Sequence, residues 1–204
     1  MAKSQSANGF SLMEMVVVVG IIGALSAIAA PMFNNAIRSF RLSGDARSVS
    51  NATAVAKMRA ASDFSRVRIY VNLTARTHRM QVFEKPSVTY PDGRWVDQGG
   101  TTTLSSGVSF GYGAVTAPPA DTQDAIGQAP PCTAPATPTV PIPNTACVMF
   151  NSRGTPIDNS FAPQGNDAIY VTDGTAVYGV TIASTGLLRM WRTPPVATPS
   201  WTRN

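Results

Sequence analysis

The chain opens with polar residues and then carries one long apolar run. After Glu14 the next charged residue is Arg38, so residues 15–37 form 23 consecutive uncharged positions. At about 1.5 Å per residue, a helix of this length reaches roughly 34 Å, which is enough to cross a hydrocarbon core of about 30 Å. The pattern predicts one membrane-spanning helix behind a short polar leader.

A second pattern covers residues 38–66, where small or apolar side chains recur at steps of three and four. Most of the cations in this segment lie off that stripe. The segment is therefore expected to be an amphipathic half-helix packed on a sheet. The stripe consists of Leu42, Ala46, Val49, Thr53, Ala56, Ala60 and Phe64.

Beyond the helix, apolar positions alternate in short runs, which is typical of half-buried strands. The clearest hairpin joins residues 168–172 to residues 176–182 across Asp173-Gly174. A long helix followed by such strands predicts an α+β fold, with a transmembrane half and an amphipathic half of the helix and an antiparallel sheet under the latter. Further strand candidates lie at residues 67–73, 78–83, 102–112, 147–150 and 187–192.

Proline is concentrated in residues 117–143, which hold eight of the 16 prolines and almost no large apolar side chains. This composition predicts a loop within the head rather than a domain. Cys132 and Cys147 are the only two cysteines. A disulfide between them would suit an oxidising compartment, and two free thiols are the alternative. Residues 193–204, with three more prolines, are expected to form a flexible tail.

The charge is unevenly distributed along the chain. Residues 38–79 carry a net charge of +7, residues 80–204 carry −2, and the whole chain carries +5. The positive-inside rule alone would place residues 38–79 in the cytoplasm. The cysteine pair favours the opposite orientation, and we expect the C-terminal head to lie outside, in the periplasm.

Glu14 stands directly before the apolar run, and the position of this charged residue needs an explanation. An acidic side chain at the centre of a spanning helix costs roughly 2.5–3.5 kcal/mol, and less near its end. The carboxylate is tolerated if a positively charged group forms an ion pair with it. The alternative is that Glu14 snorkels to the lipid headgroups.

The residues around Glu14 carry a family resemblance. Gly9-Phe10-Ser11-Leu12-Met13-Glu14, followed by an unbroken apolar helix, resembles the class III signal of type IV pilins and type II secretion pseudopilins. The resemblance implies that a prepilin peptidase cuts between Gly9 and Phe10 and methylates the new N-terminus. Residues 1–9 would then be the leader, 10–37 the transmembrane helix and 38–192 the head. Glu14 would meet the Phe10 amine of a neighbouring subunit and fix its register in a filament.

Gly23 and Pro31 gain a role from the same resemblance. Pro31 removes a backbone donor and would kink or loosen the helix. In the family, the stretch that corresponds to Gly23–Pro31 can unwind in the filament. An ordinary secretory signal, cut near residues 27–29, is the alternative interpretation of this N-terminus.

The order of elements is similar to that of GspH/FimT-type minor pilins and pseudopilins, with the Phe-Asn-Ser-Arg-Gly-Thr-Pro segment at 150–156 and a closing hairpin ending in Gly-x-x-Arg. The loop at 117–143 departs from that pattern. The resemblance implies a single-pass protein of the bacterial inner membrane that assembles into or primes a type IV pilus or a type II secretion pseudopilus. Its partners would be other pilins or pseudopilins and, for a pseudopilus, secreted proteins.

DNA capture is the alternative function, because some FimT-type minor pilins are associated with it through basic residues near the C-terminus. Here Arg189, Trp191 and Arg192, together with Trp201 and Arg203, would form the contact patch. The first Arg of the family's Gly-Arg-x-Arg-like turn is missing, which weakens the comparison. The other interpretation places Trp191 in the core and treats the arginines as ordinary strand-edge charges.

Residues suited to catalysis are scarce. His78 is the single histidine and is expected on a solvated face beside Arg76 and Arg79. The sequence has no further His or Cys at metal-ligand spacing, no phosphate-cradling glycine loop and no Gly-x-Ser-x-Gly elbow. We expect no enzymatic activity, no catalytic residues, no metal and no cofactor.

Overall fold

The structure is a computed structural model that describes residues 11–134 and 140–204. The chain divides into two compact units, Met1–Ser39 and Phe40–Asn204. Helix α1, Leu12–Ser62, begins in the first unit and ends in the second. The second unit contains all of the strands among the described residues.

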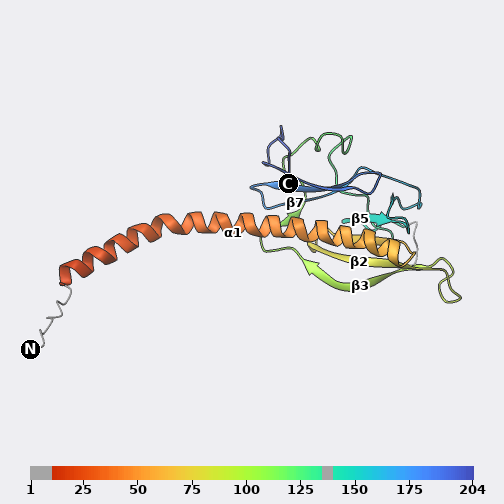
Figure 1. Cartoon of the computed structure of the whole chain (residues 1–204), viewed down its shortest axis with the longest axis horizontal. Coiled ribbons are helices and arrows are strands. Elements are labelled where there is room, and N and C mark those ends of the chain that lie inside the picture. The colour runs from red at the N-terminus through yellow and green to blue at the C-terminus, as the bar shows by residue number, and fades with distance from the viewer. Residues whose placement is uncertain (1–10, 135–139) are drawn as a thin grey trace, which may run out of the picture. The chain divides into compact units, whose positions relative to one another are not determined.

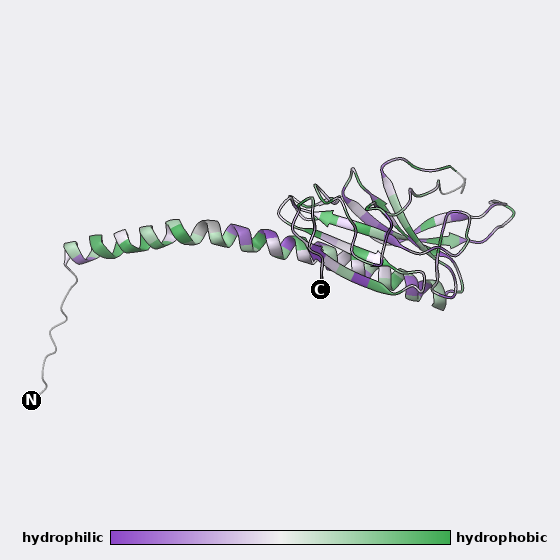
Figure 2. Cartoon of the chain, turned by 90° about the horizontal axis from the view of Figure 1, so that it is seen from above, coloured by the Kyte–Doolittle hydropathy of each residue, from purple (hydrophilic) through white to green (hydrophobic). Residues whose placement is uncertain are grey.

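In the first unit, α1 presents apolar side chains on every side. The large apolar residues from Leu12 to Phe33 are all exposed, and Figure 2 colours this segment mostly green. The helix is long and apolar enough to cross a membrane. A helix that is apolar all round suits a lipid environment rather than water. Helical backbone continues through Gly23 and Pro31, and the kink there stays a prediction.

The C-terminal end of α1 differs from the expected boundary at residue 66. The Ser65 N–H donates to the Ala60 carbonyl at 3.2 Å, and Phe64 has a φ of 47°. A residue in the left-handed region just after a helix ends it, because the chain turns away there. The prediction is therefore wrong at this end, and Phe64, expected on the buried stripe, is exposed.

Among the described residues, ten strands form two antiparallel five-stranded sheets (Figure 1). The α+β class is confirmed, with two sheets where one was expected. Sheet A has the order β3-β2-β1-β5-β6, and sheet B has the order β10-β9-β8-β7-β4. The strands of sheet A are β1 (Val67–Asn72), β2 (Thr77–Glu84), β3 (Arg94–Thr103), β5 (Thr145–Phe150) and β6 (Pro156–Ile157). Those of sheet B are β4 (Ser109–Phe110), β7 (Asp167–Thr172), β8 (Val177–Ile182), β9 (Leu188–Thr193) and β10 (Thr202–Arg203).

One core joins the stripe of α1 to the inner faces of both sheets. The stripe is confirmed up to Ala60, because its apolar members from Leu42 onward are buried in this core. Thr53 is also buried, and its hydroxyl donates to the Val49 carbonyl at 2.8 Å. Alternate residues of the strands complete the core, among them Ile69 in β1 and Val180 in β8.

The hairpins at both ends of the head were predicted correctly, but the strand expected at residues 102–112 was not. The structure places β3 at Arg94–Thr103 and only the two-residue β4 at Ser109–Phe110. The two strands are separated by a turn in which the Val108 N–H donates to the Ser105 carbonyl at 3.0 Å. The pairing of β3 with β2 also shifts between the pairs His78↔Thr102 and Met80↔Gln98. This bulge hides the alternation of β3 in the sequence.

The tail expected at residues 193–204 is folded. β10 pairs with β9, so that Arg203 lies opposite Trp191. The Trp201 indole N–H donates to the Ala117 carbonyl at 2.9 Å, and its ring centre lies 5.9 Å from that of Tyr170. The prediction of a flexible tail is wrong because the prolines bend the chain back along β9 instead of leaving it free.

Candidate functional site

Glu14 lies in the first turn of α1 with its side chain exposed. Its backbone N–H donates to the Ser11 hydroxyl at 3.2 Å, so Ser11 caps the start of the helix. Among the described residues the carboxylate of Glu14 has no ion-pair partner. Gly9 and Phe10, the predicted cleavage and methylation residues, lie outside the described residues.

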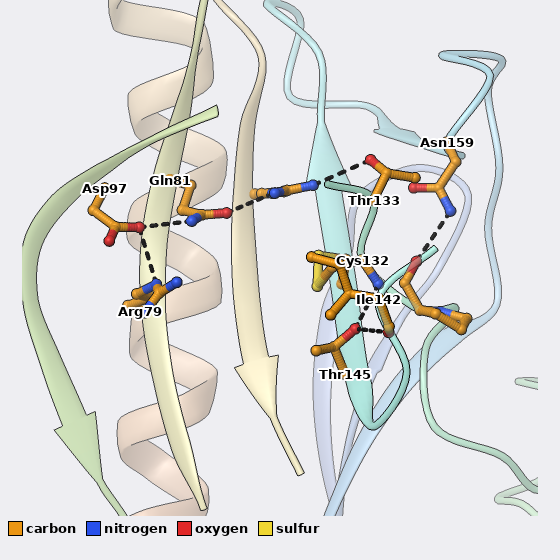
Figure 3. Close-up of a disulfide and its surroundings, with 11 residues drawn as sticks. Arg79, Gln81, Asp97, Cys132, Thr133, Ile142, Thr145 and Asn159 are labelled. Carbon is orange, nitrogen blue, oxygen red and sulfur yellow. Dashed lines mark hydrogen bonds and ion pairs between the residues drawn. A yellow bond between two sulfur atoms is a disulfide. The ribbon is translucent and has the colours of Figure 1, made fainter. Parts of the chain in front are cut away.

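Cys132 and Cys147 form a disulfide, with their Cα atoms 4.9 Å apart (Figure 3). This confirms the predicted pair and removes the alternative of two free thiols. Backbone hydrogen bonds support the bridge, because the Ile142 N–H donates to the Cys132 carbonyl and the Cys147 N–H donates to the Pro130 carbonyl. Residues 130–134 and 140–142 of the Pro-rich loop are thereby held against the outer face of sheet A, where Tyr70 packs on the two cysteines.

A chain of polar side chains runs across that outer face, and its central member is Arg68. Arg68 is fully buried; its Nε donates to Gln81 Oε1 at 2.7 Å and its Nη1 to Thr133 Oγ1 at 3.4 Å. Gln81 Nε2 in turn donates to Asp97 Oδ1 at 2.6 Å (Figure 3). Burial lowers the pKa of Arg68 to about 9, because a charged guanidinium loses its hydration there. The direct partner of Arg68 is thus an amide, and Asp97 Oδ1 beyond it also forms an ion pair with Arg79 Nε at 2.9 Å.

Arg68 was not among the residues predicted from the sequence. Its only signal was the alternation of residues 67–73, which puts Arg68 on the face opposite Val67. That face was expected to be solvated, but the Pro-rich loop covers it through Thr133. The guanidinium also lies 4.2 Å from the ring centre of Trp95. Thr133 of the loop and Trp95 of β3 thus enclose the Arg68 guanidinium on the outer face of sheet A.

The three predicted DNA-contact residues do not share one face of sheet B. Trp191 is partly buried, and its indole N–H donates to Thr181 Oγ1 on the outer face at 2.9 Å. Arg189 lies two residues away on the same face and is exposed. Arg192 is also exposed, but it points to the opposite face, with its guanidinium 5.9 Å from the ring centre of Tyr178. The expectation of one joint patch is therefore corrected.

His78 is buried rather than solvated, and this prediction was wrong. It pairs with Val71 of β1, and this register turns its ring to the inner face, under α1. Its Nε2 lies 3.5 Å from Ser48 Oγ. Burial lowers the pKa of His78, and the charge of Asp45 partly opposes this shift. No serine-histidine-aspartate relay forms here, because the carboxylate of Asp45 accepts hydrogen bonds from the backbone and hydroxyl of Ser105.

Across the described residues there is no group of three or more His, Cys, Asp or Glu side chains that could hold a metal ion. What the described residues do present is an exposed apolar segment of α1, a head closed by a disulfide and several exposed basic side chains.

No family model matches this chain, and no curated protein matches it. Among solved structures, it is similar to two of the minor pseudopilin EpsH from the type II secretion system of Vibrio cholerae. One is 12% identical with a TM-score of 0.44, and the match covers 74% of this chain and 94% of that chain. The other is 14% identical with a TM-score of 0.43, and the match covers 80% and 97%. Similarity at this level leaves the functional assignment to the residues of the chain itself.

Proposed function

We propose that this protein is a minor pilin or pseudopilin, a membrane-anchored structural subunit that assembles into or primes a type IV pilus or a type II secretion pseudopilus. The observation that carries the proposal is the motif from Gly9 to Glu14 placed directly before the apolar part of α1. This helix continues without interruption into a folded head. One helix would therefore provide both the membrane span and the support of the sheets, directly after the processing site in the sequence.

Glu14 is the assembly residue in this proposal. Cleavage after Gly9 would free the amine of Phe10, four residues before Glu14. The two groups cannot easily meet within one helix, whereas a subunit shifted along a filament can bring its amine to the carboxylate. The pair would offset the cost of a charge in lipid and fix the register of neighbouring subunits.

The partners follow from this role. A prepilin peptidase would process the chain at the bacterial inner membrane, and other pilins or pseudopilins would pack against it. The disulfide supports an oxidising periplasm as the location of the head. In a secretion pseudopilus the head would also touch secreted proteins. No catalytic step is part of this function.

Mass spectrometry of filaments sheared from the source cells tests the proposal. A methylated peptide that begins at Phe10 is the expected result in a pilus. The same peptide found only in membranes would favour a short pseudopilus. An intact Met1 end, or a cut near Ala29, would refute the pilin assignment.

A matched pair of variants tests the role of Glu14. Glu14→Gln keeps the size of the side chain and removes its charge, so processing should persist while incorporation into filaments is lost. Ser26→Ala is the control, because Ser26 is a polar residue of the same apolar segment whose hydroxyl only bonds to the Ile22 carbonyl. Equal incorporation of both variants would contradict the pairing.

DNA capture remains a second candidate, favoured by one observation. Arg203 pairs with Trp191, which places it on the outer face of sheet B beside the strand that carries Arg189. Two arginines near one indole suit phosphate contact and base stacking. The double variant Arg189→Ala/Arg203→Ala should flatten the dependence of single-stranded DNA affinity on salt, by about 0.7 in log–log slope per lost contact. Arg47→Ala on α1 is the control, and an unchanged slope in the double variant would reject this candidate.

A further inference from the structure

A pocket of about 200 Å³ lies at one end of sheet A, where β1 begins and β2 and β5 end. It belongs wholly to the second unit, and its volume far exceeds the roughly 10–15 Å³ that one water molecule needs. Figure 1 shows the β2–β3 connection, which begins at Lys85, projecting at the end of the head where α1 ends. Two of the lining residues, Arg66 and Lys85, are basic, and none is acidic.

The register of sheet A explains why these side chains lie together on its outer face. Val67 of β1 pairs with Val82 and with Phe150, and its side chain lies in the inner core. Successive residues of a strand point to opposite faces, so the next residue beyond each of these three points outward. Those residues are Arg66, Phe83 and Asn151, and all three line the pocket. The pairing continues past the start of β1, because the Phe83 N–H donates to the Arg66 carbonyl at 2.8 Å.

Arg66 is half-buried, and two aromatic rings hold its guanidinium in place. The guanidinium carbon lies 3.8 Å from the ring centre of Phe161 and 4.5 Å from that of Phe83. Neither ring carries an oxygen or nitrogen acceptor, and Nη1 is enclosed without a hydrogen-bond partner. Within the described part of the chain Arg66 forms no ion pair. Nε and Nη2 are therefore left to meet a ligand.

The acidic residues next to the pocket are already paired with other arginines. Asp63 Oδ2 lies 2.9 Å from Arg59 Nε, and Glu84 Oε2 lies 2.5 Å from Arg94 Nε. Lys85 is exposed and has no ion-pair partner among residues 11–134 and 140–204. The pocket thus has two cations without a counter-charge.

The end of α1 opposes an anion only weakly. A helix C-terminus carries partial negative charge on its free carbonyl groups. Here the Ala60 carbonyl accepts the Ser65 N–H at 3.2 Å, and the Arg59 carbonyl accepts the Asp63 N–H at 2.9 Å. Burial lowers the pKa of Arg66, and a bound anion would offset the hydration that its guanidinium has lost.

One wall of the pocket is apolar and faces water. Phe64 lines the pocket and is 75% exposed. A free inorganic anion would leave this ring in water, whereas a peptide segment could bury it against an apolar side chain. The combination favours a carboxylate carried by a protein over a small inorganic ion.

We propose that this pocket binds an acidic side chain of a partner protein, presented next to an apolar residue in the partner's sequence. The Nε–H and Nη2–H groups of Arg66 would donate to the two carboxylate oxygens. The ammonium group of Lys85 adds a second positive charge, and the ring of Phe64 packs against the apolar neighbour. The site lies within the head and depends neither on the membrane anchor nor on the filament role proposed above.

The test uses the full-length chain in nonionic detergent micelles, with nitrogen-15 NMR of the Arg66 Nε–H and the Ser152 amide as the readout. The probes are the peptide Gly-Glu-Leu-Gly, blocked at both ends, the same peptide with Gln in place of Glu, and inorganic phosphate. Saturable shifts are expected with the Glu peptide. The Gln peptide should bind about tenfold more weakly or worse, because it cannot form the charge-assisted contact.

Arg66→Met keeps an apolar side chain against Phe83 and Phe161 and removes the N–H donors. Followed at the Ser152 amide, it should weaken binding of the Glu peptide about tenfold or more. Lys85→Ala should weaken it by about two- to fivefold, as expected for an exposed charge. Arg153→Ala is the matched control, since Arg153 is an exposed arginine beside Ser152 that does not line the pocket. It should leave the affinity within about twofold.

Several results would overturn the proposal. Equal affinity for the Glu and Gln peptides would exclude the carboxylate, and shifts with phosphate but not with the Glu peptide would exclude a protein ligand. An equal loss in Arg66→Met and Arg153→Ala, or no shift with any probe, would exclude the pocket.

If Arg66→Met does not fold, the exposed Lys85 decides, and an unchanged affinity in Lys85→Ala would then exclude the pocket. None of these results bears on cleavage after Gly9 or on incorporation into filaments, so the proposed function is tested separately.

Discussion

The ammonium group of Lys57 donates a hydrogen bond to the carbonyl oxygen of Gly186 at 2.8 Å. It joins α1 to the β8–β9 turn, 129 residues further along the chain. Gly186 has a φ of 75°, and a Cβ there would lie 2.6 Å from the Gly154 carbonyl oxygen. The contact therefore needs a glycine at the turn as well as a lysine on the helix.

Gly186→Ala is expected to lower the free energy of unfolding by roughly 3 kcal/mol, because strain at a positive φ and overpacking each cost about 1–3 kcal/mol. Gly174→Ala is the matched control, with a φ of 82° and no atom within 4 Å of its added Cβ. Urea denaturation of the detergent-solubilised chain measures both. Equal losses in the two variants would show that the close approach of Gly186 to the Gly154 carbonyl oxygen contributes nothing to stability.

The disulfide leads to a second prediction. In the loop-entropy model, a closed loop of about 15 residues stabilises by about 3 kcal/mol, and Cys132 and Cys147 are separated by 15 positions. The double variant Cys132→Ser/Cys147→Ser should lose about that much stability in the same urea assay. The oxidised native chain, denatured without reductant, is the reference. A midpoint that does not move on removal of the bridge would contradict the prediction.

Arg68 and Gln81 should be strongly coupled. Arg68→Met removes the buried cation but leaves Gln81 Oε1 without its donor, so it should cost about 1–3 kcal/mol. Gln81→Leu removes the acceptor that holds the guanidinium and should cost about 3 kcal/mol or more, as in a broken buried pair.

The double variant Arg68→Met/Gln81→Leu should then be more stable than Gln81→Leu alone. A double-mutant cycle by urea denaturation measures this difference. Additive losses would mean that Arg68 and Gln81 are not coupled.

Burial of His78 predicts a dependence of stability on pH. Its pKa in the folded chain is lowered from 6.5, so the unfolded chain takes up a proton first as the pH falls. The stabilising contribution is therefore present above about pH 6.5 and is lost as the pH falls toward the lower, folded value. His78→Leu should remove this part of the slope, measured by denaturation between about pH 7 and 5.

The contribution of Asp167 to stability should change with pH in the opposite direction to that of His78, over an overlapping pH range. Burial raises the pKa of Asp167 from 3.8 to about 6, partly opposed by a hydrogen bond from Gln164. The folded chain thus binds the proton more tightly, and stability gained from Asp167 rises as the pH falls from about 6 to 3.8. Asp167→Asn should abolish that gain while leaving the His78 contribution intact. If His78→Leu and Asp167→Asn altered the same part of the pH dependence of stability, the separate assignments to His78 and Asp167 would be contradicted.

The helix could be predicted because its signals are local. Its apolar segment and its stripe repeat within a few residues, and the closing hairpin is marked by Asp173-Gly174 between two apolar runs. Its last turn could not be predicted, because Phe64 fits the spacing of the stripe while its backbone already turns away.

The face of each strand residue was harder to predict. The run at 78–83 was expected to be a strand, but only its register against β1 decides that His78 lies inside, and a shift of one residue would reverse this. The burial of Arg68 depends likewise on Thr133, 65 residues away. The pairing of β10 with β9 likewise involves the tail, which the proline content alone had suggested was free.

The edges of the two sheets affect whether copies of this protein can pair through their strands at high local concentration. Three of the four edge strands among the described residues, β4, β6 and β10, contain two residues each, and the fourth, β3, is interrupted by its bulge. Few backbone N–H and C=O groups are therefore free in a row to accept a strand from another molecule. Many copies could share a membrane at high local density without merging into continuous sheets. Contacts between them would then depend on side chains, whose attractive and repulsive pairs decide which partner is preferred.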